Sequence, residues 1–212
     1  GLVHLMKAFL DRRLPIDKFV YPTSTLRNSS RDHLLRAREF AFDHKIEMYS
    51  VSVIREGDKD RPLLLENDED WEIRVLAPPA SVIAAEELRG YRANKSPGNL
   101  TSLVLLYRST NDGEDHGRAL LPGDATLTTL KHAKSHCLDY PEYSLNNHAL
   151  VVPHHGSSNN WSSWLAQYIH GAVIISAPPR NQHHPAKKVL ESLAKHCHMG
   201  EDKSALFCTS YS

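Results

Sequence analysis

The chain has 212 residues, and its 25 Lys plus Arg balance 25 Asp plus Glu, so its formal net charge is zero at pH 7. This length holds one domain with a real core, and the charge balance excludes a global attraction to nucleic acid or to a membrane surface. Three widely spaced cysteines and the lack of an apolar run near the roughly 20 residues of a membrane span lead us to expect a cytoplasmic protein without a membrane segment.

The first half of the chain predicts mainly strands. Amphipathic or capped helices are expected over residues 2–13 and 29–44, with a short helical stretch at 84–88. Strands are expected over residues 16–21, 47–54, 62–66, 71–76, 100–108 and 118–121. The last four strands read as two hairpin-like pairs, because polar loops or turn residues separate their members.

The second half alternates helices with strands. The expected helices cover residues 126–136, 161–170 and 187–196, and the strands cover 149–152, 172–176 and 205–209. A strand-rich first half followed by this alternation predicts an α/β fold in which helices cover sheets, within a single domain spanning residues 1–212.

Three apolar strands are each followed by residues that bind metals or transfer protons. Asp124 follows the run 120–123, the pair His154-His155 with Gly156 and Ser157 follows 149–153, and Asn181 with His184 follows the third strand. Of 14 histidines, four form doublets in these places. Strands that end at one rim bring such groups together, so the sequence predicts a site of carboxylate and imidazole ligands there.

Each segment also has a simpler interpretation. Asp124 taken alone is best explained as the cap of the helix that follows it. The His154-His155 doublet fits a turn with two surface histidines, in which Ser157 and Ser158 cap the next helix. The Asn181 segment fits a proline-rich connector. A zinc site also has ligand types available, but not the spacing of a zinc finger, at His196, Cys197, His198 and Cys208.

The chain resembles the metallo-β-lactamase fold superfamily, and within it the ComEC-like branch, the C-terminal hydrolase domain of DNA-uptake channel proteins. The matching stretches are residues 99–106, 120–124, 152–157, 176–185 and 207–209. Residues 1–6 resemble the helix that follows the superfamily's His-x-(His/Asp)-x-Asp-His motif. That motif is not in this sequence, so the resemblance implies that the chain starts just beyond it.

This resemblance implies an αββα sandwich, incomplete at its N-terminus, that hydrolyses phosphodiesters, most simply as a nuclease. It implies two divalent ions, zinc or manganese, which activate a water. Asp124 would bridge the ions, and His154, with His155 as the substitute, would complete one ligand shell. The catalytic residues expected are His155, Ser157, Asn181 and His184. The expected partners are a nucleic acid or nucleotide substrate and a larger protein assembly.

Two departures from the family pattern keep alternatives open. The first is the missing motif, without which Asp124, one histidine of the doublet and His184 are too few ligands for two metals. The second is a one-residue gap before Pro185, which makes His183 an alternative to His184. The competing functions are a metal-poor binding or scaffold module of the same fold, and a lactone or thioester hydrolase acting at the same site.

Overall fold

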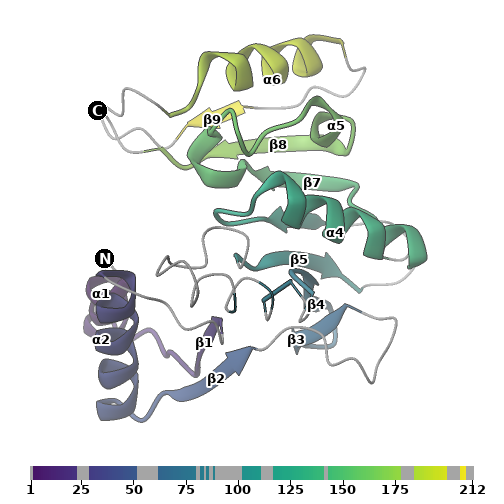
Figure 1. Cartoon of the computed structure of the whole chain (residues 1–212). Coiled ribbons are helices and arrows are strands. Elements are labelled where there is room, and N and C mark those ends of the chain that lie inside the picture. Colours follow the sequence, from purple (N-terminus) through teal and green to yellow (C-terminus); the bar gives the residue numbers. More distant parts are fainter. Residues whose placement is uncertain are drawn as a thin grey trace. The chain divides into compact units, whose positions relative to one another are not determined.

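The structure is a computed structural model, and it describes residues 2–22, 29–51, 62–79, 82–83, 85, 88, 102–110, 117–140, 143–177, 184–199 and 206–208. By its internal contacts the chain divides into two compact units. Unit 1 comprises Gly1–Ser52 and Ser81–Gly98, and unit 2 comprises Val53–Ala80 and Asn99–Ser212. Helices and strands are mixed, as Figure 1 shows, which confirms the α/β prediction at that level. The single-domain organisation stays a prediction.

Unit 1 is built around a β-α-β element. Its elements are α1 (Leu2–Asp11), β1 (Lys18–Pro22), α2 (Ser29–Asp43) and β2 (Glu47–Val51). The strands β1 and β2 pair in parallel, with Lys18 opposite Glu47 and Pro22 opposite Val51. The helices and strands share one small core, formed by Met6, Phe19, Ala37, Phe40, Ala41 and Ile46. Of the helical stretch expected at residues 84–88, Ala85 and Leu88 are described and helical.

Unit 2 contains a seven-stranded mixed sheet whose strands lie side by side in chain order (Figure 1). They are β3 (Leu63–Asn67), β4 (Trp71–Ala77), β5 (Val104–Ser109), β6 (Arg118–Leu121), β7 (Asn147–Val151), β8 (Ile169–Ile175) and β9 (Leu206–Cys208). Strands β3 to β6 run antiparallel, as the predicted pairs require, whereas β6 to β9 run parallel. The carboxyl ends of β6, β7 and β8 therefore point to the same rim.

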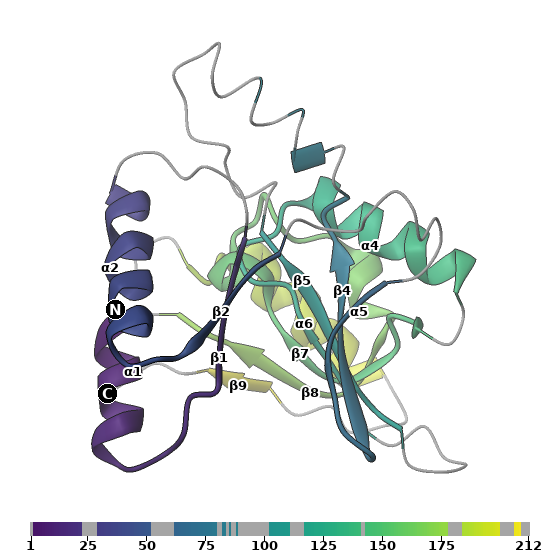
Figure 2. The same ribbon diagram turned by 90° about the horizontal axis from the view of Figure 1, so that it is seen from below.

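The helices α4 (Leu127–Asp139), α5 (Ser163–Ala166) and α6 (Lys187–Met199) cover this sheet (Figures 1 and 2). A row of neighbouring residues crosses it in register, from Leu106 through Leu120 and Leu150 to Val173. These four side chains are almost fully buried and share one core cluster with residues of all three helices. Burying such a row against helices stabilises the sheet, since each aliphatic side chain removed from water contributes about 1.5–3 kcal/mol.

One predicted helix is wrong over its second half. The pattern predicted a helix over residues 161–170, but α5 covers Ser163–Ala166 and β8 begins at Ile169. Asn147 explains the change, because its backbone N–H and its side-chain amide both donate to the Tyr168 carbonyl, at 2.9 and 3.0 Å. These tertiary hydrogen bonds end the helix before Tyr168. A local sequence pattern cannot predict them, because Asn147 is distant in the sequence.

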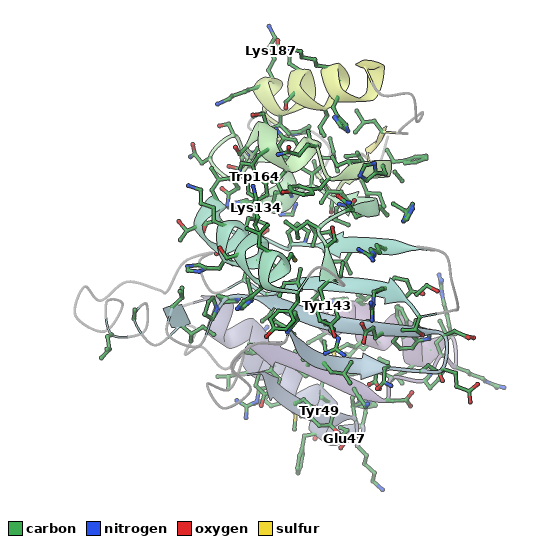
Figure 3. The ribbon with its side chains drawn as sticks, turned by 90° about the vertical axis from the view of Figure 1, so that its right-hand side faces the viewer. Glu47, Tyr49, Lys134, Tyr143, Trp164 and Lys187 are labelled. Atoms are coloured by element: carbon green, nitrogen blue, oxygen red, sulfur yellow. The ribbon has the colours of Figure 1, made fainter. Side chains whose placement is uncertain are left out.

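A cation–π contact joins α4 to the short helix α5. Lys134 Nζ lies 5.1 Å from the ring centre of Trp164, and Figure 3 shows the two side chains beside one another. The same ammonium lies 5.7 Å from the ring centre of Tyr168. This contact places Lys134 and Trp164 in helix packing. No described helix is long and apolar enough to cross a membrane.

Candidate functional site

Asp124 lies in the turn between β6 and α4. Its neighbour Gly123 has φ +54°, and the N–H of Ala125 closes the turn on the Pro122 carbonyl at 3.0 Å. The helix cap is Thr126, whose hydroxyl accepts the N–H of Thr129 at 3.3 Å. The interpretation of Asp124 as the cap is therefore wrong, because a neighbouring hydroxyl fills that role. The carboxylate is 48% exposed and available for other contacts.

The histidine doublet lies in an unusual turn just beyond β7. His154 and His155 both have positive φ, at +46° and +55°, and Gly156 follows at +85°. Consecutive left-handed residues other than glycine are uncommon and cost roughly 1–3 kcal/mol each, and they are found mainly where a functional site requires them. The alternation of side chains expected at a strand end thus does not apply, since β7 has already ended at Val151.

This turn aims His155 at Asp124. The Nδ1 atom of His155 lies 2.5 Å from the Ser176 carbonyl oxygen, and its Nε2 lies 3.8 Å from Oδ1 of Asp124. A carbonyl can only accept, so Nδ1 carries the hydrogen and Nε2 is the nitrogen that faces the carboxylate. Asp124, His155 and Ser176 follow β6, β7 and β8. The group predicted from the third strand end was Asn181 or His184, and Ser176 was not among the candidates.

The third predicted segment meets the second at Gly156. A Cβ atom placed on Gly156 would lie 2.7 Å from Cβ of Pro185, and the Gly156 carbonyl accepts the N–H of Ala186 at 2.9 Å. The ring of His184 lies 5.7 Å, centre to centre, from the ring of His154, and its Nδ1 is buried. The structure therefore brings His184 beside His154, while His155 faces Asp124. Asn181 and His183 lie outside the described residues.

The serines of this loop do not cap the following helix. The N-cap residue of α5 is Ser162, and its side chain makes no capping bond. Ser157 is buried, and its N–H donates to the His154 carbonyl at 2.9 Å. Ser158 is exposed.

Sequence reasoning missed Asn160. This residue is 6% exposed, and its Nδ2 donates to the Ala125 carbonyl at 2.8 Å, so it ties the histidine loop to the Asp124 turn. Asn is common in loops because its amide bonds to backbone groups. Its partner here lies 35 positions away, and no local pattern identifies such a partner.

Several other histidines have structural contacts. His44, His136 and His196 each donate to a backbone carbonyl, of Phe40, Leu76 and Ile169 respectively. The bond of His196 engages its Nε2 atom, which leaves only Nδ1 for the alternative zinc site considered at His196, Cys197, His198 and Cys208. Within the described part of the chain, no group of three or more His, Cys, Asp or Glu is placed to hold a metal ion.

The residues present fit one edge of a metal site. A histidine that ligates a metal almost always donates its other ring N–H to a carbonyl or carboxylate, as His155 does to Ser176. Two ligands of one tetrahedral zinc lie roughly 3.4 Å apart, given bonds of about 2.0–2.1 Å. The 3.8 Å between Asp124 and His155 is close to that value.

Comparisons of the chain with protein-family models, with curated proteins and with solved structures found no match.

Proposed function

We propose that this chain belongs to a metal-dependent hydrolase of phosphodiesters, most simply a nuclease, with an αββα sandwich of the metallo-β-lactamase type. The observation that carries the proposal is the Asp124–His155 pair, in which a half-exposed carboxylate faces the Nε2 atom of a ring held by a backbone carbonyl. The mixed sheet with helices over it, and the order of the Asp and His motifs along it, support the same assignment.

The geometry favours His155 over His154 as the imidazole that acts with Asp124. The bond from Nδ1 of His155 to the Ser176 carbonyl orients the ring so that Nε2 faces the carboxylate, and a cation bound there would interact favourably with both groups. A divalent ion held there would act as a Lewis acid that activates water. The remaining positions around such an ion would be filled by water or by residues beyond this pair.

The neighbouring histidines suit the leaving side of the reaction. The ring centres of His154 and His184 lie 5.7 Å apart. His154 comes shortly before Gly156 in the chain, and His184 comes directly before Pro185, which lies against Gly156. Imidazole groups donate hydrogen bonds to phosphate oxygens and transfer protons near neutral pH. In this proposal they bind the scissile phosphate and protonate the departing oxygen, together with Asn181, which precedes His184 by three positions in the sequence. Ser157 contributes by closing the loop that carries His154.

A binding or scaffold module of the same fold is the second candidate. The observation in its favour is that the described residues supply two facing ligand groups and no set of three. Such a module would keep the hydrogen bonds that join the Asp124 turn to the histidine loop but would bind no catalytic metal.

The test is cleavage of a model phosphodiester and of single-stranded DNA by the chain with Mn²⁺ or Zn²⁺. Asp124→Ala and His155→Ala are expected to lower the rate by at least about 100-fold, because each removes a group that would hold the ion. The matched controls are Asp43→Asn and His170→Ala, which change exposed residues outside the site and should leave the rate unchanged.

The outcomes separate the candidates. Metal-dependent cleavage that both site variants abolish supports the hydrolase. Metal binding without cleavage of any phosphodiester, together with hydrolysis of a lactone or thioester, assigns the site to another ester class. A chain that neither binds the metal ions nor cleaves any of these substrates favours the scaffold module.

A further inference from the structure

The carbonyls of the two residues next to Asp124 in the sequence both accept hydrogen bonds from the histidine loop. The carbonyl of Gly123, just before Asp124, accepts the backbone N–H of His154 at 2.9 Å. The carbonyl of Ala125, just after it, accepts the side-chain amide of Asn160 at 2.8 Å. Two hydrogen bonds, one on each side of Asp124, therefore fix the turn that carries Asp124 to the loop that carries His155.

Asn160 is itself fixed within that loop. Its backbone N–H donates to the Ser157 carbonyl at 3.1 Å, and the Ser157 N–H donates to the His154 carbonyl at 2.9 Å. These bonds form a chain from Asn160 through Ser157 to His154, next to His155. Because Asn160 is only 6% exposed, water competes little for its side-chain amide, and the hydrogen bond to the Ala125 carbonyl is stronger than it would be in water.

We infer that Asn160 is a positioning residue for the Asp124–His155 pair. It touches neither side chain of the pair in the bonds described, and acts through the peptide between Ala125 and Thr126, one residue beyond Asp124. Holding that peptide keeps the carboxylate and the Nε2 atom at a set spacing before a ligand arrives, which lowers the entropy lost on binding. The role of this spacing in binding a metal ion rests on the proposed function. The effect of Asn160 on the spacing does not, because it can be measured in the metal-free chain.

The test compares Asn160→Ala with Asn159→Ala, which removes an identical, exposed amide at the adjacent position. The first readout is the ¹H–¹⁵N spectrum of the His155 ring in the metal-free protein. Asn160→Ala is expected to shift the Nδ1 and Nε2 resonances, because the spacing to Asp124 is no longer held, whereas Asn159→Ala leaves them at the wild-type positions.

The second readout is the affinity for Zn²⁺, measured by competition with a chromophoric chelator. Loss of a residue that orients metal ligands lowers metal affinity by about 10- to 100-fold. We expect a loss in that range for Asn160→Ala and a change of less than about twofold for Asn159→Ala. A residue with a merely structural role would change the unfolding midpoint without moving the ring resonances.

The two proposals fail in different ways. If the wild-type chain binds no Zn²⁺, the metal-site proposal fails, and the ring resonances of Asn160→Ala still decide the role of Asn160. If Asn160→Ala binds Zn²⁺ as wild type does and its His155 resonances are unmoved, the positioning role is overturned. Should Asn160→Ala not fold, Asn160→Ser, which keeps a shorter donor, takes its place with the same expected directions and the same overturning result.

Discussion

The Nε2 atom of His155 lies 3.8 Å from Oδ1 of Asp124, and the opposite nitrogen of the ring is bonded to the Ser176 carbonyl. The spacing is too long for a hydrogen bond between the two side chains, so a third atom can lie between them. Both groups are nearly half exposed, so that atom can arrive from solvent. Residues that follow β6, β7 and β8 thus come together in unit 2.

The close approach of Gly156 to Pro185 predicts a large cost for any side chain at position 156. In Gly156→Ala the new Cβ would meet Cβ of Pro185 at 2.7 Å and its Cα at 3.1 Å, at a backbone φ of +85°. We expect a loss of about 3 kcal/mol in the free energy of unfolding, combining strain in φ with overpacking. Urea denaturation followed by circular dichroism measures it.

Gly117→Ala is the matched control for that substitution. Gly117 also has positive φ, at +74°, but its added Cβ meets no atom closer than Cβ of Ser109 at 3.9 Å. It should lose only about 1–2 kcal/mol, from the backbone conformation alone. Equal losses at the two positions would contradict the proposed contact between the Gly156 and Pro185 segments.

A buried carboxylate between two arginines predicts strong dependence of stability on Glu72. Its oxygens bind Arg74 at 2.9 Å and Arg108 at 2.7 Å, and both guanidinium groups lie over the ring of Tyr143, which Figure 3 labels within the sheet unit. Glu72→Gln removes the negative charge and leaves two like charges close together. We expect a loss of about 3 kcal/mol in unfolding free energy by urea denaturation.

Glu191→Gln provides the comparison for an exposed ion pair. Glu191 Oε1 lies 3.6 Å from Nζ of Lys187, and both residues belong to α6. The Lys187 side chain is 90% exposed and extends outward from α6 in Figure 3. Such pairs contribute about 0.5 kcal/mol or less. A loss for Glu72→Gln no larger than this would show that the arginine pair does not depend on the carboxylate.

Cys137 predicts a decline in stability at alkaline pH. Burial raises the pKa of its thiol from 9.0 to about 12, while the positive charge of Arg118 opposes the rise. Between these values the unfolded chain loses the proton that the folded chain keeps. Unfolding therefore releases a proton, and the free energy of unfolding falls by up to about 1.4 kcal/mol per pH unit above pH 9. Below pH 9 both states are protonated and the thiol contributes no pH dependence.

Cys137→Ala isolates this contribution from the other groups that titrate at high pH. The variant should lose unfolding free energy less steeply than wild type between pH 9 and 11. Urea denaturation at half-unit steps of pH measures both curves. Parallel curves would mean that the Cys137 thiol titrates at its ordinary pKa in the folded chain.

The strand ends that form the site could be predicted from the sequence because apolar runs and turn residues are local signals. The runs before Asp124 and before His154 gave β6 and β7 to within two residues, and their parallel pairing brought both ends to one rim. The order of these motifs was therefore enough to predict convergence.

The choice of imidazole could not be predicted, because it depends on backbone conformation. Strand alternation applied to His154 and His155 gives no preference, whereas the left-handed turn and the Ser176 carbonyl select His155. Asn160 was missed for a similar reason, since its partner at Ala125 is distant in sequence. The end of α5 was set by Asn147, another distant contact.

The most direct measurement is a Zn²⁺ titration of the chain, following the ¹⁵N signals of the His155 ring and the ¹³Cγ signal of Asp124 by NMR. We expect the signals of Nε2 of His155 and Cγ of Asp124 to shift together, while Nδ1 keeps its hydrogen. Asp124→Ala should raise the Zn²⁺ concentration needed for the His155 response by at least tenfold. Zn²⁺ binding that leaves both signals in place, or a His155 response unchanged by Asp124→Ala, would contradict the proposed site.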